Sequence, residues 1–112
     1  MKSTVLLFTG NGMGTAPEDL SRTLTKNYLS LLCEENKVPA ALLFYGEGVK
    51  LVCEGSPVLE SMSVLEARGV KLLVCKTCLN YFGLPDKIKA GQVGTMADIL
   101  TMQLEAGKVI SV

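Results

Sequence analysis

Two cysteines three positions apart form the most informative chemical motif of this 112-residue chain. In Cys75-Lys76-Thr77-Cys78, the first cysteine ends an apolar run and the second falls in the first turn of an expected helix. Backbone N–H groups and the helix dipole stabilise an anion at a helix start, so a thiolate there is expected to have a lowered pKa. Lys76 adds a positive charge nearby. This setting favours persulfide or disulfide chemistry, with Cys75 and Cys78 as the candidate catalytic residues.

Two other interpretations of the pair stay open. In the first, both thiols are small hydrophobic side chains packed at a strand–helix junction. In the second they bind zinc, but a structural zinc site needs four ligands and the chain has no histidine. The other cysteines are single, and we expect Cys33 in the core and Cys53 in a structural position. The sequence therefore predicts no metal and no cofactor.

Composition disfavours several classes of function. The absence of histidine removes Ser-His-Asp and Cys-His nucleophile pairs. Eleven basic residues balance eleven acidic ones and aromatic residues make up only 5% of the chain, so we expect no nucleic-acid partner. No run approaches the roughly 20 apolar residues of a membrane span, so we expect no membrane partner. Four cysteines without a recognisable signal peptide favour thiols in a reducing, cytoplasmic setting.

Three apolar segments predict strands that are buried on both faces of a sheet, namely Val5–Thr9, Ala40–Tyr45 and Val70–Cys75. A terminal strand is expected over Lys108–Val112. Helical patterns separate the strands, which favours parallel pairing and a three-layer α/β/α sandwich of class α/β with four or five strands. At 112 residues, the chain is expected to be a single domain, residues 1–112.

Apolar spacing predicts helices over about 16–36 and 95–106, a helix that starts at Ser56 and Pro57, and short helical segments over 49–54 and 77–82. Thr15 and Glu18 predict a capping box at the first of these helices. The expected inner face of that helix consists of Leu20, Leu24, Tyr28, Leu31 and Leu32. The expected inner face of the helix after Pro57 consists of Val58, Met62 and Leu65, and that of the last helix of Met96, Ile99, Leu100 and Leu104.

Ligands of parallel α/β sheets bind beyond the carboxyl ends of the strands, where three segments should meet: 10–14, 46–48 and 75–78. We expect both thiols to lie within a few ångströms of the two glycine-containing loops. The candidate substrate-binding residues are Gly12, Gly14, Glu47, Gly48, Lys76 and Thr77. The amides of the first loop are suited to an anion. Its spacing, G-x-G-x-G, does not match the dinucleotide fingerprint.

The segment Cys75–Leu84, CKTCLNYFGL, resembles the C-G-T-C-L-x-x-x-G-L segment of the DsrE/DsrF-like family. It is most similar to the C-terminal domain of YedF-type, selenium-metabolism-associated sulfurtransferase-like proteins. Further similarity lies in Phe44-Tyr45, in Gly48-Val49-Lys50-Leu51 and in the segment 54–59, EGSPVL. The resemblance implies a single DsrE-like α/β/α domain with a mostly parallel five-stranded sheet and homo-oligomers. It also implies a persulfide on the strand-end cysteine, Cys75.

The resulting hypothesis is a persulfide (sulfur or selenium) carrier that uses Cys75, with Cys78 resolving or sharing the sulfur. A sulfur-donor or acceptor protein is expected to act in trans, and the apolar composition predicts a homo-oligomer. A thiol–disulfide redox protein and a non-catalytic, small-anion-binding or assembly module are the alternatives. Of the thiols, Cys75 is expected to be the more acidic and to alkylate first, with Cys78 slower and Cys33 nearly inert.

Overall fold

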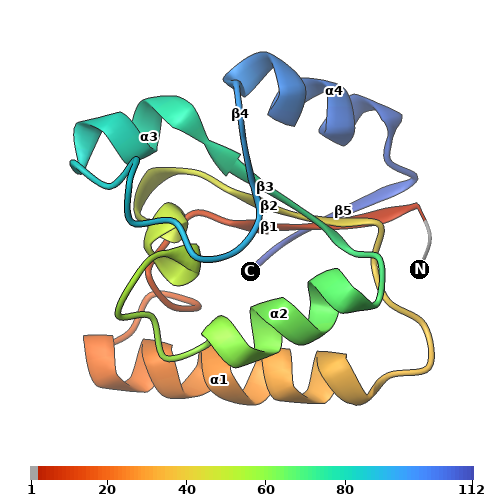
Figure 1. The fold of residues 1–112 in the computed structure, drawn as a ribbon. Coiled ribbons are helices and arrows are strands. Elements are labelled where there is room, and N and C mark those ends of the chain that lie inside the picture. Colours follow the sequence, from red (N-terminus) through yellow and green to blue (C-terminus); the bar gives the residue numbers. More distant parts are fainter. Residues whose placement is uncertain (1–2) are drawn as a thin grey trace.

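The computed structural model describes residues 3–112, which fold into an all-parallel, five-stranded sheet of order β4-β3-β2-β1-β5. The strands are β1 (Thr4–Phe8), β2 (Ala41–Phe44), β3 (Lys71–Cys75), β4 (Gln92–Gly94) and β5 (Lys108–Ser111). Helices α1 (Glu18–Glu34) and α2 (Leu59–Ala67) cover one face, and α3 (Lys76–Tyr81) and α4 (Met96–Glu105) cover the other (Figure 1). The expected three-layer α/β/α sandwich is confirmed.

The core lies on the three central strands. Every residue of β1 and β2 is buried, as are the last four residues of β3. The rings of Phe8 and Phe44, at the carboxyl ends of β1 and β2, stack with their centroids 5.4 Å apart. Continuous apolar runs therefore became strands covered on both faces, as the sequence predicted.

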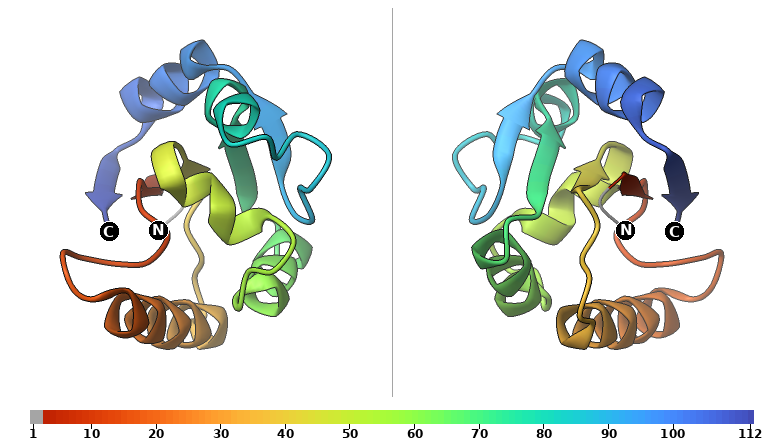
Figure 2. Two further views of the ribbon diagram at one scale, coloured as in Figure 1. Left: turned by 90° about the vertical axis from the view of Figure 1, so that its left-hand side faces the viewer. Right: turned by 90° about the vertical axis from the view of Figure 1, so that its right-hand side faces the viewer.

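A seven-residue 3-10 helix, η1 (Gly46–Val52), follows β2 directly and lies at the carboxyl edge of the sheet. Figure 2 (left) views this edge and shows η1 in front of the strands, with α3 above it and α1 below. The loop over 84–90 runs beside the end of η1, where Cys53 and Ile88 form an antiparallel bridge. The short helical segment expected over 49–54 thus begins earlier, at Gly46.

The first helix begins later than predicted, at Glu18, and Thr15 forms no capping box. A residue before proline is disfavoured in the α region, so Ala16 cannot continue the helix backwards past Pro17. Instead, the 10–16 loop folds back onto the first turn, where the N–H of Met13 donates to the carbonyl of Ser21 over 3.2 Å.

The buried face of α1 is also different from the predicted one. It consists of Ser21, Thr25, Leu29 and Leu32, whereas Leu20, Leu24 and Leu31 are 47%, 41% and 65% exposed. The helix is rotated by about one residue, roughly 100°, because the loop needs a small side chain beneath it. A Cβ on Gly12 would lie only 2.7 Å from that of Ser21.

The remaining helices match the predictions in part. α2 begins at Leu59 because Ser56 accepts a hydrogen bond from the N–H of Val58 over 3.2 Å in a preceding turn. Its predicted inner residues Val58, Met62 and Leu65 are buried. In α4 only Ile99 is buried; the other three predicted inner residues, Met96, Leu100 and Leu104, are 49%, 52% and 76% exposed. Over residues 3–112, no helix combines the length and the apolarity that crossing a membrane requires.

Candidate functional site

The two cysteines of the motif occupy different environments at the β3–α3 junction. Cys75 is the last residue of β3, pairs in register with Gly94 of β4, and is fully buried. Cys78 lies in the first turn of α3 and is half-buried. The buried neighbour Leu79 anchors α3 on the core. The motif therefore presents one thiol toward the surface and keeps the other inside.

Cys78 contacts both the helical segment after β2 and the other thiol. The N–H of Gly46 donates a hydrogen bond to the Sγ of Cys78 over 3.1 Å. Burial raises the pKa of the Cys78 thiol; the Gly46 N–H lowers the pKa in opposition, and the neighbouring Cys75 thiol raises it again. The net shift is upward, so the lowered pKa expected at the helix start is wrong for Cys78.

The position of Cys75 argues against the expectation that it alkylates first. The side chain of Cys75 has no exposed surface. β3 is the second strand in from its edge of the sheet, and η1 and α3 both pack against it. A reagent in solvent therefore reaches Cys78 before Cys75, which reverses the accessibility on which the predicted order of reaction depends.

The predicted proximity of the thiols to the two glycine-containing loops holds for the 46–48 loop and not for the 10–14 loop. Gly46, the first residue of the 46–48 loop, contacts Cys78 directly. Gly12, Gly14 and Glu47 instead line a cavity of about 490 Å³ between the 10–16 loop, the start of α1 and η1. Within the described residues 3–112, the lining of this cavity includes neither cysteine of the motif.

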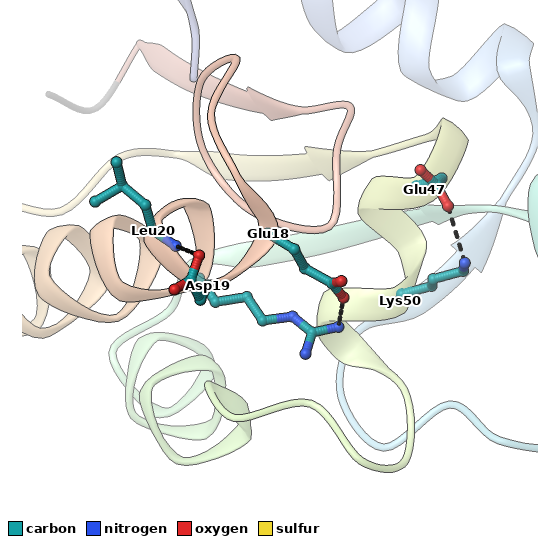
Figure 3. A network of polar contacts seen from close by, with 6 residues as sticks. Glu18, Asp19, Leu20, Glu47 and Lys50 are labelled. Carbon is teal, nitrogen blue, oxygen red and sulfur yellow. Dashed lines mark hydrogen bonds and ion pairs between the residues drawn. The ribbon is translucent and has the colours of Figure 1, made fainter.

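Two cations border this cavity and also a second one, of about 310 Å³: Arg22 of α1 and Lys50 of η1. Arg22 is 2.6 Å from Glu18, and Lys50 is 2.9 Å from Glu47. Figure 3 shows the Glu47–Lys50 pair on η1 and Glu18 on α1. Each cation is thus paired with a carboxylate of its own helix, so the cavity wall has no net excess of positive charge.

The other predicted site residues differ in exposure. Lys76 and Thr77 are exposed on the first turn of α3, and Gly48 is buried because η1 passes closely over the end of β1. Cys53 is buried and donates to the carbonyl of Val49 over 3.2 Å, as expected of a structural thiol. Cys33 is half-buried rather than fully in the core.

Sequence reasoning missed Gly46 as a contact of the reactive motif. Gly46 belongs to the 46–48 segment expected at this edge, but only Glu47 and Gly48 of that segment are predicted as site residues. A strand end followed by Gly-x-Gly is the available signal, because glycine is favoured where the backbone is left-handed or closely packed. Among residues 3–112, no group of three or more His, Cys, Asp or Glu side chains is arranged to hold a metal ion.

The model of the DsrE/DsrF-like family matches residues 3–112. No curated protein matches the sequence. Three similar solved structures share its fold. The YchN protein from E. coli is 21% identical, with full coverage of both chains and a TM-score of 0.68.

The second is MTH1491 from Methanobacterium thermoautotrophicum, a protein of unknown function. It is 22% identical, with 97% of each chain covered and a TM-score of 0.70. The third is BT1422 from Bacteroides thetaiotaomicron, a conserved protein of unknown function. It is 20% identical, with 98% of this chain and 95% of that chain covered and a TM-score of 0.69. At these identities the likeness establishes the fold alone.

Proposed function

The chain belongs to the DsrE/DsrF-like family, and from this membership and the paired thiols of Cys75 and Cys78 we propose that it carries sulfur as a persulfide. The observation that carries the proposal is the half-buried thiol of Cys78, which lies beside a second thiol and accepts a backbone hydrogen bond. A half-buried thiol of this kind can be reached by a small or protein-bound donor.

In the loading step, the Cys78 thiolate attacks the terminal sulfur of a donor persulfide, R–S–S⁻. The new S–S bond forms on Cys78 as the donor S–S bond breaks, and the donor leaves as R–S⁻. In the transfer step, an acceptor nucleophile attacks the outer sulfur and Cys78 leaves as a thiolate. No net oxidation or reduction of the protein occurs over the two steps.

Cys75 has a different role in this proposal from the one first expected of it. Because its side chain is buried, it does not meet the donor. Its thiolate is placed to attack the inner sulfur of a Cys78 persulfide when no acceptor is present. That reaction forms a Cys75–Cys78 disulfide and releases HS⁻. The two electrons that the cysteines lose leave with the sulfide.

The finer family assignment is also part of the proposal. The similarity of Cys75–Leu84 to the YedF-type C-terminal domain supports a protein of that kind, acting as a single DsrE-like domain in the cytoplasm. The Cys78 thiolate can attack a terminal selenium in the same way as a terminal sulfur. The selenium analogue of the donor persulfide is therefore included among the proposed substrates.

The proposed partners are a second copy of the chain and a sulfur donor or acceptor protein in trans. The exposed apolar side chains of α4 support a homo-oligomer, because Met96, Leu100 and Leu104 leave a continuous apolar helix face uncovered. The balanced charge of the chain supports partners other than nucleic acid.

The test uses the reduced, purified protein and sodium tetrasulfide as the donor. After removal of the donor, intact mass and peptide mapping should show a gain of about 32 Da on Cys78. Added cyanide should then remove the sulfur as thiocyanate. We expect Cys78→Ser to abolish thiocyanate formation, and Cys33→Ser, at the other half-buried thiol, to leave it unchanged.

The outcomes separate the alternatives. A loss of about 2 Da without released sulfide would favour a thiol–disulfide redox protein. No mass change would favour a non-catalytic binding module. Sulfur that requires Cys75 and not Cys78 would restore the order of roles first expected from the sequence and overturn the assignment of Cys78.

A further inference from the structure

We propose that Gly46 is a built-in hydrogen-bond donor to the reacting sulfur of Cys78, held in place by the end of β1. The inference rests on the proposed function, because it assigns to Gly46 the stabilisation of the Cys78 thiolate during both sulfur loading and sulfur transfer. Gly46 lies outside the Cys75–Cys78 motif and donates to the more exposed thiol of the pair.

The first observation is the contact itself. The Gly46 nitrogen lies 3.1 Å from the Sγ of Cys78, which is short for a hydrogen bond to sulfur. The two residues are 32 positions apart, and they come from the elements that follow β2 and β3. The contact therefore depends on the parallel pairing of these two strands, which brings their carboxyl ends to the same edge.

The second observation is that the end of β1 fixes the position of this N–H. The N–H of Tyr45 donates to the carbonyl of Phe8 over 3.2 Å, and the N–H of Gly48 donates to the carbonyl of Tyr45 over 3.0 Å. Gly46 thus lies between two backbone anchors. The donor is oriented before any substrate arrives, which is the condition under which a dipole stabilises a developing charge most.

The third observation is that the position requires glycine for two separate reasons. Its φ of +58° lies in the left-handed region, which L side chains rarely adopt. A Cβ at this residue would also lie 3.0 Å from the carbonyl oxygen of Thr9. Gly83 has a similar φ of +69° but open space around it, so it provides a matched comparison.

The chemistry follows from the charge on sulfur. An N–H donates a stronger hydrogen bond to a thiolate than to a thiol. In loading, Cys78 attacks as the thiolate, and in transfer it leaves as the thiolate, so the same donor stabilises the charged sulfur in both steps. Cys75 is the N-cap residue of α3 and is fully buried, so the Gly46 N–H acts on the thiol of the pair that solvent reaches.

The decisive experiment is an NMR titration of the ¹⁵N-labelled Cys75→Ser protein, in which only one thiol of the pair remains. We expect the Gly46 amide proton to shift with pH at the midpoint given by the thiolate absorbance of Cys78. The shift should disappear in the protein that also carries Cys78→Ala. A Gly46 amide that stays constant while Cys78 ionises would overturn the inference.

Two variants extend the test to reaction rate. Gly46→Ala should slow sulfur loading from sodium tetrasulfide by about tenfold, because the added Cβ pushes the backbone away from the Thr9 carbonyl, moves the N–H off the Cys78 sulfur and so raises the pKa of the thiol. Gly83→Ala carries the same conformational strain away from the thiol and should load at the wild-type rate. Equal slowing in both variants would contradict the proposal. If Gly46→Ala does not fold, the titration still decides.

The titration also separates this inference from the proposed function. A protein whose Gly46 amide follows Cys78 ionisation but which takes up no sulfur would retain the hydrogen bond and lose the persulfide role. A protein that loads Cys78 while the Gly46 amide stays unchanged would retain the persulfide role and lose the donor.

Discussion

The Nζ of Lys50 lies 4.5 Å from the centroid of the Phe82 ring. This cation–π contact joins η1 to the residue that follows α3, the helix that contains Cys78. The same Nζ is 2.9 Å from the Oε1 of Glu47. A single ammonium group thus links the two elements that hold the candidate thiol and its backbone donor.

We expect Lys50→Met to lower the free energy of unfolding by about 1 kcal/mol, since it removes a partly exposed cation–π contact and an ion pair. Lys87→Met is the control, because Lys87 pairs with Glu54 at 3.7 Å and both side chains are about half exposed or more. The control should lose about 0.3 kcal/mol. Urea denaturation measures both, and equal losses would contradict a role for Phe82.

Timed alkylation should label the thiols in the order set by exposure. With iodoacetamide near neutral pH, we expect Cys78 to react well before Cys75, because Cys75 has no exposed surface. Cys53, also buried, should react as slowly as Cys75. Peptide mapping at several times measures the order. Earlier labelling of Cys75 would show that the β3–α3 junction opens in solution.

The reaction of Cys78 should accelerate as pH rises. Burial raises the pKa of this thiol, and the Gly46 N–H does not fully offset the increase. The thiol form therefore dominates at neutral pH, and the reactive thiolate increases about tenfold for each pH unit until the pKa is reached. Alkylation rates of the Cys78 peptide measure this slope. A rate that is flat through neutral pH would mean that the pKa is lowered instead.

The exposed face of α4 should mediate self-association. Leu100 and Leu104 are 52% and 76% exposed, and we expect Leu100→Glu with Leu104→Glu to convert an oligomer to monomers. Leu31→Glu is the control, since Leu31 is 65% exposed on α1, across the sheet from α4. Light scattering measures the mass. A monomeric wild-type protein at micromolar concentration would remove the proposed assembly.

The docking of the 10–16 loop on α1 should depend on Gly12. Gly12→Ala places a Cβ 2.7 Å from that of Ser21, at a φ of +148°, and should cost about 1–3 kcal/mol of stability. Gly14→Ala is the control, because its φ is also positive but no atom lies within 4 Å of the added Cβ. Thermal unfolding compares the two. A smaller loss of stability for Gly12→Ala than for Gly14→Ala would mean that the loop is not packed on the helix.

Local sequence patterns determined the elements of this protein. The apolar runs of β1, β2 and β3 are long enough to specify buried strands, and the helical spacing between them leaves parallel pairing as the available arrangement. The same reasoning placed the Cys75–Cys78 motif at a strand–helix junction and the 46–48 loop at the same edge. These features depend on residues close together in the chain, so they can be read from sequence.

Tertiary packing decided which side of each element is covered. Periodicity marks apolar positions on α1 but does not weigh them against the need for a small Ser21 beneath Gly12, so the helix turns Leu20 and Leu24 outward. In the same way, neighbours distant in sequence bury Cys75 and leave Cys78 accessible. The hydrogen bond from Gly46 to Cys78 spans 32 residues and exists only because β2 and β3 pair in parallel.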